Sequence, residues 1–582
     1  GVGQTSPVAL IEAIKAFPGD LKLVPLPDMP WGGYEVMTAP CIEACPAHVN
    51  VPRYIDYIKA GRTDYATGVV LRHYPLVGSC GRVCVRLCEK ACRRNRLEGA
   101  VDIKNLKRYC ADSLGYTVDK MFEGAAAEPS EFSPRIAIIG AGPSGLTCAY
   151  HLLLKGYKVE VFEAQRKAGG MALVGIPQYR LPKDILLAEA NTIEQLGGKF
   201  HYGRRLGKDF TLDDLFNEGF NAVFIGVGCA KGMKLGFPED NEQIEGYYNG
   251  LDFLLQVERG VVEGEAPSFS GDFVVVGGGN VAIDAARVSA RSGAAKVTML
   301  CLEQRNEMPA SDEEVAEAEA DGVTVNNGWG PKQVVVDDNG VATAIVFKRC
   351  TSVYDNEHKF APVYDEEDTL TLPADKIIFA IGQSIQWGDL LSGTKVEFAG
   401  RAMYPKADKL TYQTAEPDIF VGGDVYTGPK FAIDAIAQGH EAAESLHRYV
   451  QHGHMTIGRN RREFVQLNTD DISVESYDHA PRQVAARDTS IDGKGFEDNH
   501  GTLTEEQVRV ETARCLGCGA SIVDANKCIG CGLCTTKCAF DAIHLSRDLP
   551  EASNMRIAEK KFGAILPYAI KRGFKILGNK NN

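Results

Sequence analysis

The feature that most constrains the fold of this chain is a glycine fingerprint that occurs twice, each time between a short apolar strand and a helix. In the first copy, the apolar run 135–139 leads into Gly140-Ala-Gly142-Pro-Ser-Gly145. Gly140 makes a tight turn, Gly142 lets the backbone approach a pyrophosphate, and Gly145 lets the helix pack closely. The next strand ends at Glu163, about twenty residues further on, where a carboxylate accepts a ribose hydroxyl. The pattern predicts a dinucleotide-binding unit.

The second copy predicts a second nucleotide-binding unit. After an apolar strand it reads Gly277-Gly-Gly279-Asn280-Val-Ala282, and the fingerprint permits alanine in the last place. A strand expected over 295–302 ends near Glu303. A carboxylate there would bind a free 2′-hydroxyl and repel a 2′-phosphate, so the sequence favours NADH over NADPH. Two alternatives stay open: Glu303 faces solvent, or Arg305 reaches a phosphate.

Further glycines mark where the chain crosses between the two predicted folds. We expect the flavin site to be completed by Gly170, Gly228, Gly423 and Asp424, and the pyridine-nucleotide site by Gly382. The carboxylate of Asp424 can meet the ribityl chain of a flavin. The N-terminus of a helix expected over 432–449 would face the flavin ring as a favourable dipole.

Four cysteines near the C-terminal end are spaced in the way that holds an iron–sulfur cluster. They form the run Cys528-x2-Cys531-x2-Cys534-x3-Cys538. This spacing wraps a short loop around one 4Fe-4S cube, and it departs from the bacterial ferredoxin pattern only at Ala539, where proline usually follows. Zinc is the alternative, but four cysteines packed so closely suit a tetrahedral zinc ion poorly.

Eight further cysteines bring the candidate ligands to twelve, the number that three 4Fe-4S clusters require. They are Cys41, Cys45, Cys80, Cys84, Cys88 and Cys92 near the start, and Cys515 and Cys518 before the tail loop. A tail with two complete clusters would need about eight cysteines, more than it has. We therefore hypothesise that Cys515 and Cys518 share a cluster with Cys41 and Cys92. The alternative keeps two clusters in the tail, with oxygen ligands or thiols from a partner.

The composition excludes several classes of protein. The chain has 582 residues, 44% hydrophobic and 24% charged, as in an ordinary soluble globular protein. Its net charge of -14 argues against nucleic acid as a partner, and no apolar run is long enough for a transmembrane segment. The opening residues show no export signal, so we expect a cytoplasmic protein with metal-ligating cysteines rather than disulfides. Five cysteines stand singly and are expected to be buried structural thiols: Cys110, Cys148, Cys229, Cys301 and Cys350.

Several tracts occur together with the two glycine fingerprints: Cys41-x3-Cys45-Pro46, Gly81-Arg-Val-Cys84, Ile103-Lys-Asn-Leu-Lys107, Met308-Pro-Ala310 and Gly422-Gly-Asp424. On these tracts, residues 41–450 resemble a family of iron–sulfur flavoproteins. The family includes the small subunit of glutamate synthase, the flavin module of dihydropyrimidine dehydrogenase, and the large subunit of NADH-dependent ferredoxin:NADP oxidoreductase. The part after Thr512 is similar to the ferredoxin extension that some bacterial members carry.

The resemblance implies FAD in the first fold, a pyridine nucleotide in the second, and 4Fe-4S clusters in the N-terminal helical region. The chain departs from the family pattern in two places. The family usually has two arginines that hold the 2′-phosphate of NADPH, where this chain has Leu302 and Glu303. The family's upstream Cys-x2-Cys is absent before Cys41, and Cys515 and Cys518 are the candidates to replace it.

The fold class expected from these features is multidomain α/β. It has an N-terminal helical iron–sulfur domain, two Rossmann-like domains with the NAD(P) domain inserted in the FAD domain, and a C-terminal ferredoxin-like domain. Helical apolar spacing over 51–60 and 65–74 supports the first of these. The expected boundaries are an extension over 1–40, the helical 4Fe-4S domain over 41–130, the FAD domain over 131–250 and 386–450, the NAD(P)H domain over 251–385, a linker over 451–510, the ferredoxin-like domain over 511–548, and a partner-docking tail over 549–582.

Together these features predict a flavin–iron–sulfur oxidoreductase subunit. Electrons would pass between NADH, or NADPH, and the 4Fe-4S clusters through FAD, and then to or from a partner subunit or a ferredoxin. Hydride transfer requires no acid–base residues, and the sequence suggests none. Two alternatives remain: a non-enzymatic relay or assembly subunit of a larger redox complex, and a self-contained reductase, for which the sequence offers no substrate domain.

The end of the chain predicts an amphipathic arm. Residues 555–580 combine large apolar side chains with Lys560, Lys561, Lys571 and Arg572. We prefer docking to a partner subunit as its role. An ordinary packed tail and binding to a membrane surface are the alternatives.

Overall fold

The structure is a computed structural model. It describes residues 34–36, 38–114, 129–237, 240, 243–265, 267–400, 402–457, 459, 462–464, 478–518, 530–537, 543–545 and 558–578. The described residues belong to two compact units, residues 1–519 and residues 520–582.

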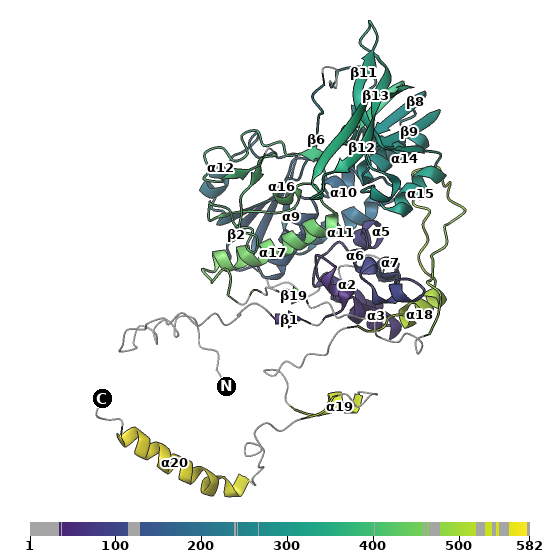
Figure 1. The fold of residues 1–582 in the computed structure, drawn as a ribbon. Coiled ribbons are helices and arrows are strands. Elements are labelled where there is room, and N and C mark those ends of the chain that lie inside the picture. Colours follow the sequence, from purple (N-terminus) through teal and green to yellow (C-terminus); the bar gives the residue numbers. More distant parts are fainter. Residues whose placement is uncertain are drawn as a thin grey trace. The chain divides into compact units, whose positions relative to one another are not determined.

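The first glycine fingerprint lies in a parallel sheet with the strand order β18-β5-β2-β3-β4 (Figure 1). Its strands are β2 (Arg135–Ile139), β3 (Lys158–Glu163), β4 (Lys199–Tyr202), β5 (Ala222–Ile225) and β18 (Ile419–Val421). Strands β2 and β5 are almost wholly buried, as is usual where helices cover both faces of a parallel sheet. The helices of this fold are α9 (Pro143–Leu154), α10 (Met171–Val174), α11 (Lys183–Gln195), α12 (Leu212–Asn217), α16 (Asp424–Thr427) and α17 (Ala432–Val450).

Helices α9 and α17 pack against each other at very short range. A Cβ atom added at Gly439 of α17 would lie 2.2 Å from the carbonyl oxygen of Ser144 in α9. Only glycine fits at such an approach. The contact holds the first turn of α17 beside the first glycine loop.

The second fingerprint lies in another parallel sheet, with the strand order β10-β9-β8-β14-β7. Its strands are β7 (Tyr247–Asn249), β8 (Asp272–Val276), β9 (Lys296–Cys301), β10 (Thr324–Asn327) and β14 (Lys376–Phe379). Its helices are α13 (Gly250–Glu263), α14 (Asn280–Arg291), η2 (Arg305–Glu307) and α15 (Asp312–Ala320). Because β7 pairs with β14, residues 247–249 already belong to this sheet, just ahead of the boundary expected at 251.

An antiparallel sheet projects beyond the second fold, as Figure 1 shows. It consists of β11 (Trp329–Val336), β12 (Ala342–Tyr354) and β13 (Phe360–Pro373), in that order. The shorter described strands form three pairs: β6 (Lys231–Gly232) with β15 (Gln383–Ser384), β16 (Phe398–Ala399) with β17 (Tyr404–Pro405), and β1 (Tyr34–Val36) with β19 (Arg462–Phe464).

The N-terminal helical domain is built around two buried tyrosines. Its helices are α2 (Pro40–Glu43), α3 (Val51–Lys59), α4 (Thr63–Leu71), α5 (Val77–Val83), α6 (Leu87–Lys90), η1 (Arg93–Arg96) and α7 (Ile103–Leu114). Tyr54 and Tyr74 are fully buried, and the Tyr54 hydroxyl donates to the carbonyl of Ile103 at 3.1 Å. The helices expected over 51–60 and 65–74 correspond to α3 and α4, and α4 ends before Tyr74.

A carboxylate from the first nucleotide fold fixes the start of α5. Glu189 of α11 is 1% exposed and accepts hydrogen bonds from the backbone N–H groups of Gly78 at 2.6 Å and Ser79 at 3.1 Å. An anion at a helix N-terminus satisfies free N–H groups and interacts favourably with the helix dipole. Since α5 carries Cys80, this contact ties the cysteine ladder to the nucleotide fold.

We call residues 478–518 the return segment, because it leads the chain back to the N-terminal helical domain. It contains α18 (Glu505–Ala513). His500 lies 3.1 Å from Glu317 of α15, and Asp498 lies 3.2 Å from Arg108 of α7. The polar composition predicts a surface linker over 451–510, and the described polar residues of this region form ion pairs with two domains.

A buried ion pair anchors the end of the return segment. Arg514 and Glu511 have fully buried side chains, and Arg514 Nη1 donates to Glu511 Oε1 at 2.6 Å. Arg514 also donates to the carbonyls of Gly99 and Ala100 in the helical domain. Glu511 accepts a second hydrogen bond, from the N–H of Asp102 at 2.7 Å. A buried pair needs such additional partners to offset the loss of hydration.

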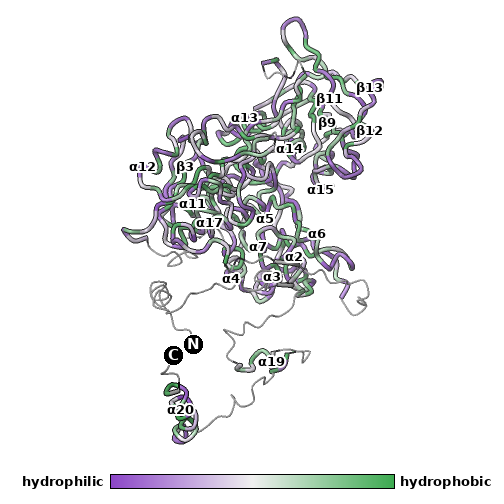
Figure 2. Tube along the Cα trace, turned by 60° about the vertical axis from the view of Figure 1, so that its left-hand side comes forward, coloured by the Kyte–Doolittle hydropathy of each residue, from purple (hydrophilic) through white to green (hydrophobic). Residues whose placement is uncertain are grey.

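The unit of residues 520–582 contains α19 (Leu533–Lys537), η4 (Ala558–Lys560) and α20 (Lys561–Gly578). Helix α20 is amphipathic, as predicted, and Figure 2 shows hydrophobic and hydrophilic residues along it. Its exposed large apolar side chains are Phe562, Ile565, Leu566, Tyr568, Ile570, Phe574, Ile576 and Leu577. Across the described residues of both units, no helix has the length and apolar character needed to cross a membrane.

We predict that Glu511→Ala detaches the return segment from the helical domain. The substitution leaves Arg514 buried without its carboxylate, a loss that costs on the order of 3–5 kcal/mol. Hydrogen exchange of the full chain measures the effect: amides of residues 99–102 and 480–514 should exchange about 100-fold faster or more. Glu506→Ala is the control, because Glu506 is 83% exposed and lies 4.0 Å from Arg509. Unchanged exchange in Glu511→Ala would contradict the prediction.

Candidate functional site

A cavity of about 930 Å³ lies where the two nucleotide folds meet the helical domain. It is lined by the glycine loops of both folds, by the first turn of α17, and by Cys80 and Cys84 of the cysteine ladder. Its volume is at the upper end of the range of small-molecule sites, about 300–1,000 Å³. The cavity therefore has room for a large organic cofactor in contact with the ladder.

Most residues expected to bind the flavin line this cavity. They are Gly140, Gly142, Glu163, Gly170, Gly228, Gly423 and Asp424. Gly145 lies behind the loop, where an added Cβ atom would be 1.9 Å from the carbonyl oxygen of Gly140. At Gly142 the nearest atom to an added Cβ is the Cα of Gly170, at 3.9 Å, so this stretch of backbone faces open space. The loop thus has the exposed backbone that a pyrophosphate requires.

Two carboxylates stand on the cavity wall. Glu163 ends β3, and its carboxylate accepts hydrogen bonds from the N–H groups of Ala141 at 2.7 Å and Gln165 at 2.8 Å. Burial raises the pKa of Glu163, although these two N–H groups act in the opposite direction. Asp424 begins α16, and burial raises its pKa to about 6. Both carboxylates can accept hydrogen bonds from hydroxyl groups of a nucleotide cofactor.

The second fold contributes fewer of its expected residues to the cavity wall. Gly279, Asn280 and Gly382 line the cavity. No atom lies within 4 Å of a Cβ added at Gly279, so the start of α14 is open. Gly277 and Ala282 do not line the cavity: Gly277 has a φ of +140° and Ala282 is fully buried. These two residues shape the loop, and the open N-terminus of α14 is where a phosphate can bind.

Glu303 lies over the second glycine loop. A Cβ atom added at Gly278 would be 2.6 Å from Glu303 Oε2, so the carboxylate covers this glycine. Burial raises the pKa of Glu303. Arg305 is paired elsewhere, with Glu319 at 2.8 Å. The side chain closest to the loop at this position is therefore an acid and not an arginine.

The structure brings together four cysteines from both ends of the described chain. We call Cys41, Cys92, Cys515 and Cys518 the first thiol group. Burial raises the pKa of Cys41, and the neighbouring thiols of Cys92, Cys515 and Cys518 raise it further. Burial also raises the pKa of Cys515, to about 11. Thiols placed close enough to influence one another in this way are suited to share a metal cluster, whose positive ions favour the thiolates.

A second thiol group consists of Cys45, Cys80, Cys84 and Cys88. Burial raises the pKa values of Cys45, Cys80 and Cys88, and in each case the thiol of Cys84 raises it further. Cys84 is therefore the member that lies near all the others. A small cavity lies among Cys45, Cys84 and Cys88, so these three residues line one common space.

The second thiol group shares a wall with the large cavity. Cys84 and Ile433 line both the small cavity and the large one. Ile433 lies in the first turn of α17, which the close contact with α9 holds in place. A thiol and one apolar side chain are thus common to both cavities.

Among the described residues, no group of three or more His, Cys, Asp or Glu side chains is placed to hold a single metal ion. A 4Fe-4S cluster attaches its thiolates to separate irons, so its ligands do not converge on one point. Cys531 lies just before α19 and Cys534 lies in it, and both side chains are exposed. Cys528 and Cys538, also expected as ligands, lie outside the described residues.

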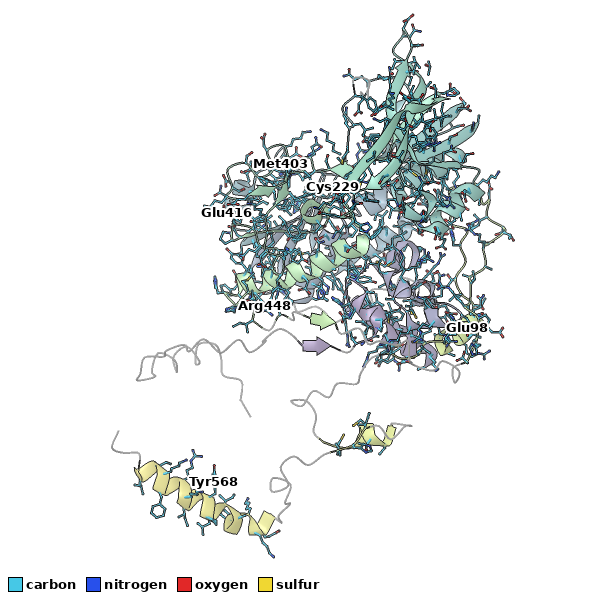
Figure 3. All side chains as sticks on the ribbon, in the orientation of Figure 1. Glu98, Cys229, Met403, Glu416, Arg448 and Tyr568 are labelled. Atoms are coloured by element: carbon cyan, nitrogen blue, oxygen red, sulfur yellow. The ribbon has the colours of Figure 1, made fainter. Side chains whose placement is uncertain are left out.

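The cysteines that stand singly are buried, as the sequence predicts. They are Cys110, Cys148, Cys229, Cys301 and Cys350. Cys229, labelled in Figure 3, lines the large cavity, and its thiol donates to the carbonyl of Asp424 at 3.4 Å. It thus belongs to the wall around the expected flavin site.

Sequence reasoning missed two charged residues beside the thiols. Lys107 of α7 lines the small cavity together with Cys84. Burial raises the pKa of Cys518, and the nearby guanidinium of Arg93 partly offsets this effect. The sequence shows that the tract 103–107 is part of the family pattern. Only the folded chain shows that Lys107, within this tract, lies beside the thiols.

Three family models match the chain. The pyridine nucleotide-disulphide oxidoreductase model matches residues 134–439, which is more than half of the chain. A model described as dihydropyrimidine dehydrogenase domain II, 4Fe-4S cluster, matches residues 34–117. A 4Fe-4S binding domain matches residues 521–544. The matches confirm the expected order of helical iron–sulfur region, nucleotide folds and ferredoxin-like region.

Similar proteins support the same family. The NADP(+)-dependent formate dehydrogenase subunit beta of Moorella thermoacetica is 35% identical, over 83% of this chain and 71% of that protein. The glutamate synthase [NADPH] small chain of Escherichia coli K12 is 32% identical, over 71% and 88%. The NAD-dependent dihydropyrimidine dehydrogenase subunit PreT of Escherichia coli O157:H7 is 32% identical, over 71% and 91%. The resemblance inferred from the sequence is confirmed.

We predict that Gly142→Ala leaves the chain folded but weakens flavin binding. The added methyl group meets no atom closer than 3.9 Å in the protein, yet it stands on the cavity wall beside the exposed loop. Flavin affinity should fall about tenfold or more, equivalent to ~1.4 kcal/mol, because the backbone can no longer approach a pyrophosphate. Flavin absorbance per chain after dialysis measures the loss.

Gly68→Ala is the matched control for this substitution. Gly68 lies in α4, and an added Cβ there also meets no atom within 4 Å. The control should keep its flavin and should be at least as stable to heat as the parent chain, because alanine favours a helix more than glycine does. Full flavin retention by Gly142→Ala would show that the first glycine loop does not hold the cofactor.

Proposed function

Because this chain belongs to the pyridine nucleotide-disulphide oxidoreductase family, we propose that it is the flavin–iron–sulfur subunit of a redox complex, transferring electrons between NADH and 4Fe-4S clusters. A bound flavin supplies the exchange between two-electron hydride chemistry and one-electron cluster chemistry. The described cysteines of the nucleotide folds stand singly, so the thiol groups of the helical domain replace a redox disulfide as the partner of the flavin.

The wall shared by the two cavities carries this proposal. Cys84 faces the large cavity on one side and the second thiol group on the other. If Cys84 is a cluster ligand, its own side chain is all that separates the cluster from the large cavity, in which we propose that the flavin binds. Ile433 also lines both cavities, and its apolar side chain would exclude water from the space between the flavin and the cluster.

The residues of the large cavity bind and orient the cofactors. We assign Gly140, Gly142 and Gly170 to the pyrophosphate of FAD, and Glu163 and Asp424 to its hydroxyl groups. The first turn of α17 directs its dipole toward the flavin ring. At the second fold, Gly279 and Asn280 receive the pyridine nucleotide at the start of α14.

The two thiol groups and the tail loop would provide the ligands of three clusters. The second thiol group would hold the cluster beside the flavin, and the first thiol group a cluster further along the helical domain. Cys41 and Cys45 are close in sequence, as are Cys88 and Cys92, and each pair divides between the two groups. The two clusters would therefore be neighbours. The tail loop Cys528, Cys531, Cys534 and Cys538 would hold the third.

Electrons would leave the chain for a partner protein. Three of the relatives are named subunit beta, small chain and subunit, and we propose that this chain is likewise part of an assembly. We propose that the exposed apolar face of α20 docks onto a partner subunit. A ferredoxin that meets the tail cluster would serve the same purpose.

NADH is the proposed nucleotide. The relatives include both NADP- and NAD-dependent proteins by name, so the choice of nucleotide depends on the residues of this chain. Glu303 covers the second glycine loop and would repel a 2′-phosphate, while Arg305 is held by Glu319. Both observations favour a free 2′-hydroxyl.

We predict that Cys515→Ala removes one cluster while the flavin stays. The first thiol group would keep only three thiols, so iron should fall by about 4 of 12 atoms per chain, and one cluster signal should vanish from the electron paramagnetic resonance spectrum. Cys110→Ala is the control, because Cys110 is a buried thiol of the same domain that belongs to neither thiol group. Two intact N-terminal clusters in Cys515→Ala would rule out the shared ligand set.

We predict that NADH bleaches the flavin at lower concentration than NADPH, and that Glu303→Gln narrows the difference. The neutral amide no longer repels a 2′-phosphate, so the apparent affinity for NADPH should rise by about tenfold, equivalent to ~1.4 kcal/mol. Anaerobic titration of the holoprotein measures both nucleotides. Glu307→Gln is the control, since Glu307 lies near Glu303 in η2 but its carboxylate accepts a hydrogen bond from the N–H of Gln304 at 3.3 Å. A parent chain that prefers NADPH would refute the assignment.

A further inference from the structure

We propose that Lys107 sets the reduction potential of the cluster at the second thiol group, acting as a buried positive charge that favours the reduced state. The inference rests on the proposed function, because it takes the second thiol group as the ligands of the cluster beside the flavin. Lys107 would be a positioning residue, because it changes the reduction potential of the cluster without itself carrying the electron.

The position of Lys107 supports this role. It lies in α7, is 6% exposed, and lines the small cavity with Cys45, Cys84 and Cys88. Its ammonium also lies 6.0 Å from the ring of Tyr74, a buried residue that follows α4. Thus Lys107 reaches the interior of the domain on the side where the thiols gather.

The charge of Lys107 has anionic partners only if the thiols are ionised. In the part of the chain that the structure describes, no ion pair joins Lys107 to a carboxylate, and the groups that act on it most strongly are Cys84 and Cys80. Because a buried ammonium without an anion is very costly, the site is built to face negative charge.

A cluster bound by thiolates supplies that negative charge. Such a cluster is an anion, and reduction adds one more electron to it. A fixed cation at close range therefore stabilises the reduced form more than the oxidised form. Reduction would add one electron, supplied by a bound flavin, without forming or breaking a bond, and the charged side chain of Lys107 would stabilise the added charge.

The surroundings of the first thiol group are different. There the cation is Arg93, which lies beside Cys518, and the carboxylate of Asp56 contributes to the raised pKa of Cys515. Carboxylates accompany both groups, because Glu189 adds to the effect of burial on the pKa of Cys80 and Glu89 adds to it at Cys88. The groups differ in their cation, which at the second group is a buried lysine that lines the small cavity together with Cys84.

Redox titration of the holoprotein, followed by electron paramagnetic resonance, tests the inference. Lys107→Met and Lys107→Gln remove the charge, Lys107→Arg keeps it, and Lys104→Met is the control. Lys104 lies in the same helix, but its charged neighbours are Arg86, Glu313 and Glu89 rather than thiols. Iron and flavin are measured in every variant.

We expect one cluster signal to move to a more negative potential in Lys107→Met and Lys107→Gln, and to remain in place in Lys107→Arg and Lys104→Met. NADH should still bleach the flavin in both neutral variants, but should reduce this cluster less. Loss of this one cluster in both neutral variants, with retention in Lys107→Arg, would also support the inference, because the charge is then needed to hold the cluster.

Two outcomes would overturn the inference. The first is an unchanged potential for every cluster in neutral variants that keep their iron. The second is loss of the cluster in all three Lys107 variants, arginine included, which would mean that side-chain shape matters and charge does not. A parent holoprotein whose flavin is not reduced by either nicotinamide would instead refute the proposed function, so the two failures are distinguishable.

Discussion

The arrangement of the helical domain depends on the buried pair of Arg514 and Glu511. This pair fastens the return segment to the backbone of residues 99–102 and stands directly before Cys515. Without it, the thiols of Cys515 and Cys518 would have no fixed place beside Cys41 and Cys92. A buried ion pair with all these partners holds one geometry, because any other geometry would leave a charge buried and unpaired.

The flavin cavity depends on close contacts that only glycine allows. Gly145 against Gly140, and Gly439 against Ser144, bring a loop and two helices together so that the first turn of α17 reaches the cavity. This places Ile433 against the helical domain, where Cys84 completes the wall. The proposed electron path between flavin and cluster is thus a consequence of helix packing, and the charge of Lys107 lies at its far side.

Much of the nucleotide-binding architecture could be predicted from the sequence. The glycine fingerprints and the strands that end at Glu163 and near Glu303 are local patterns. Such a pattern specifies a turn, a strand or a helix start without information from distant parts of the chain. The role of residues 478–510 could not be predicted in the same way. Their polar composition is that of a surface linker, and their ion pairs with Glu317 and Arg108 involve partners far away in sequence.

By itself, the sequence determined the chemistry of this protein: two nucleotide loops, a cysteine ladder and a ferredoxin-like run, each of which depends on residues a few positions apart. The cysteine count suggested that Cys41, Cys92, Cys515 and Cys518 share a cluster, whereas only the tertiary structure decided that Cys84 lines two cavities and that Lys107 is buried beside the thiols. The physical reason is that these features depend on contacts between separate helices of the fold, such as Lys107 of α7 beside Cys84, and Cys84 beside Ile433 of α17. Spacing along the chain carries no record of such contacts, whereas packing and the pairing of buried charges select them.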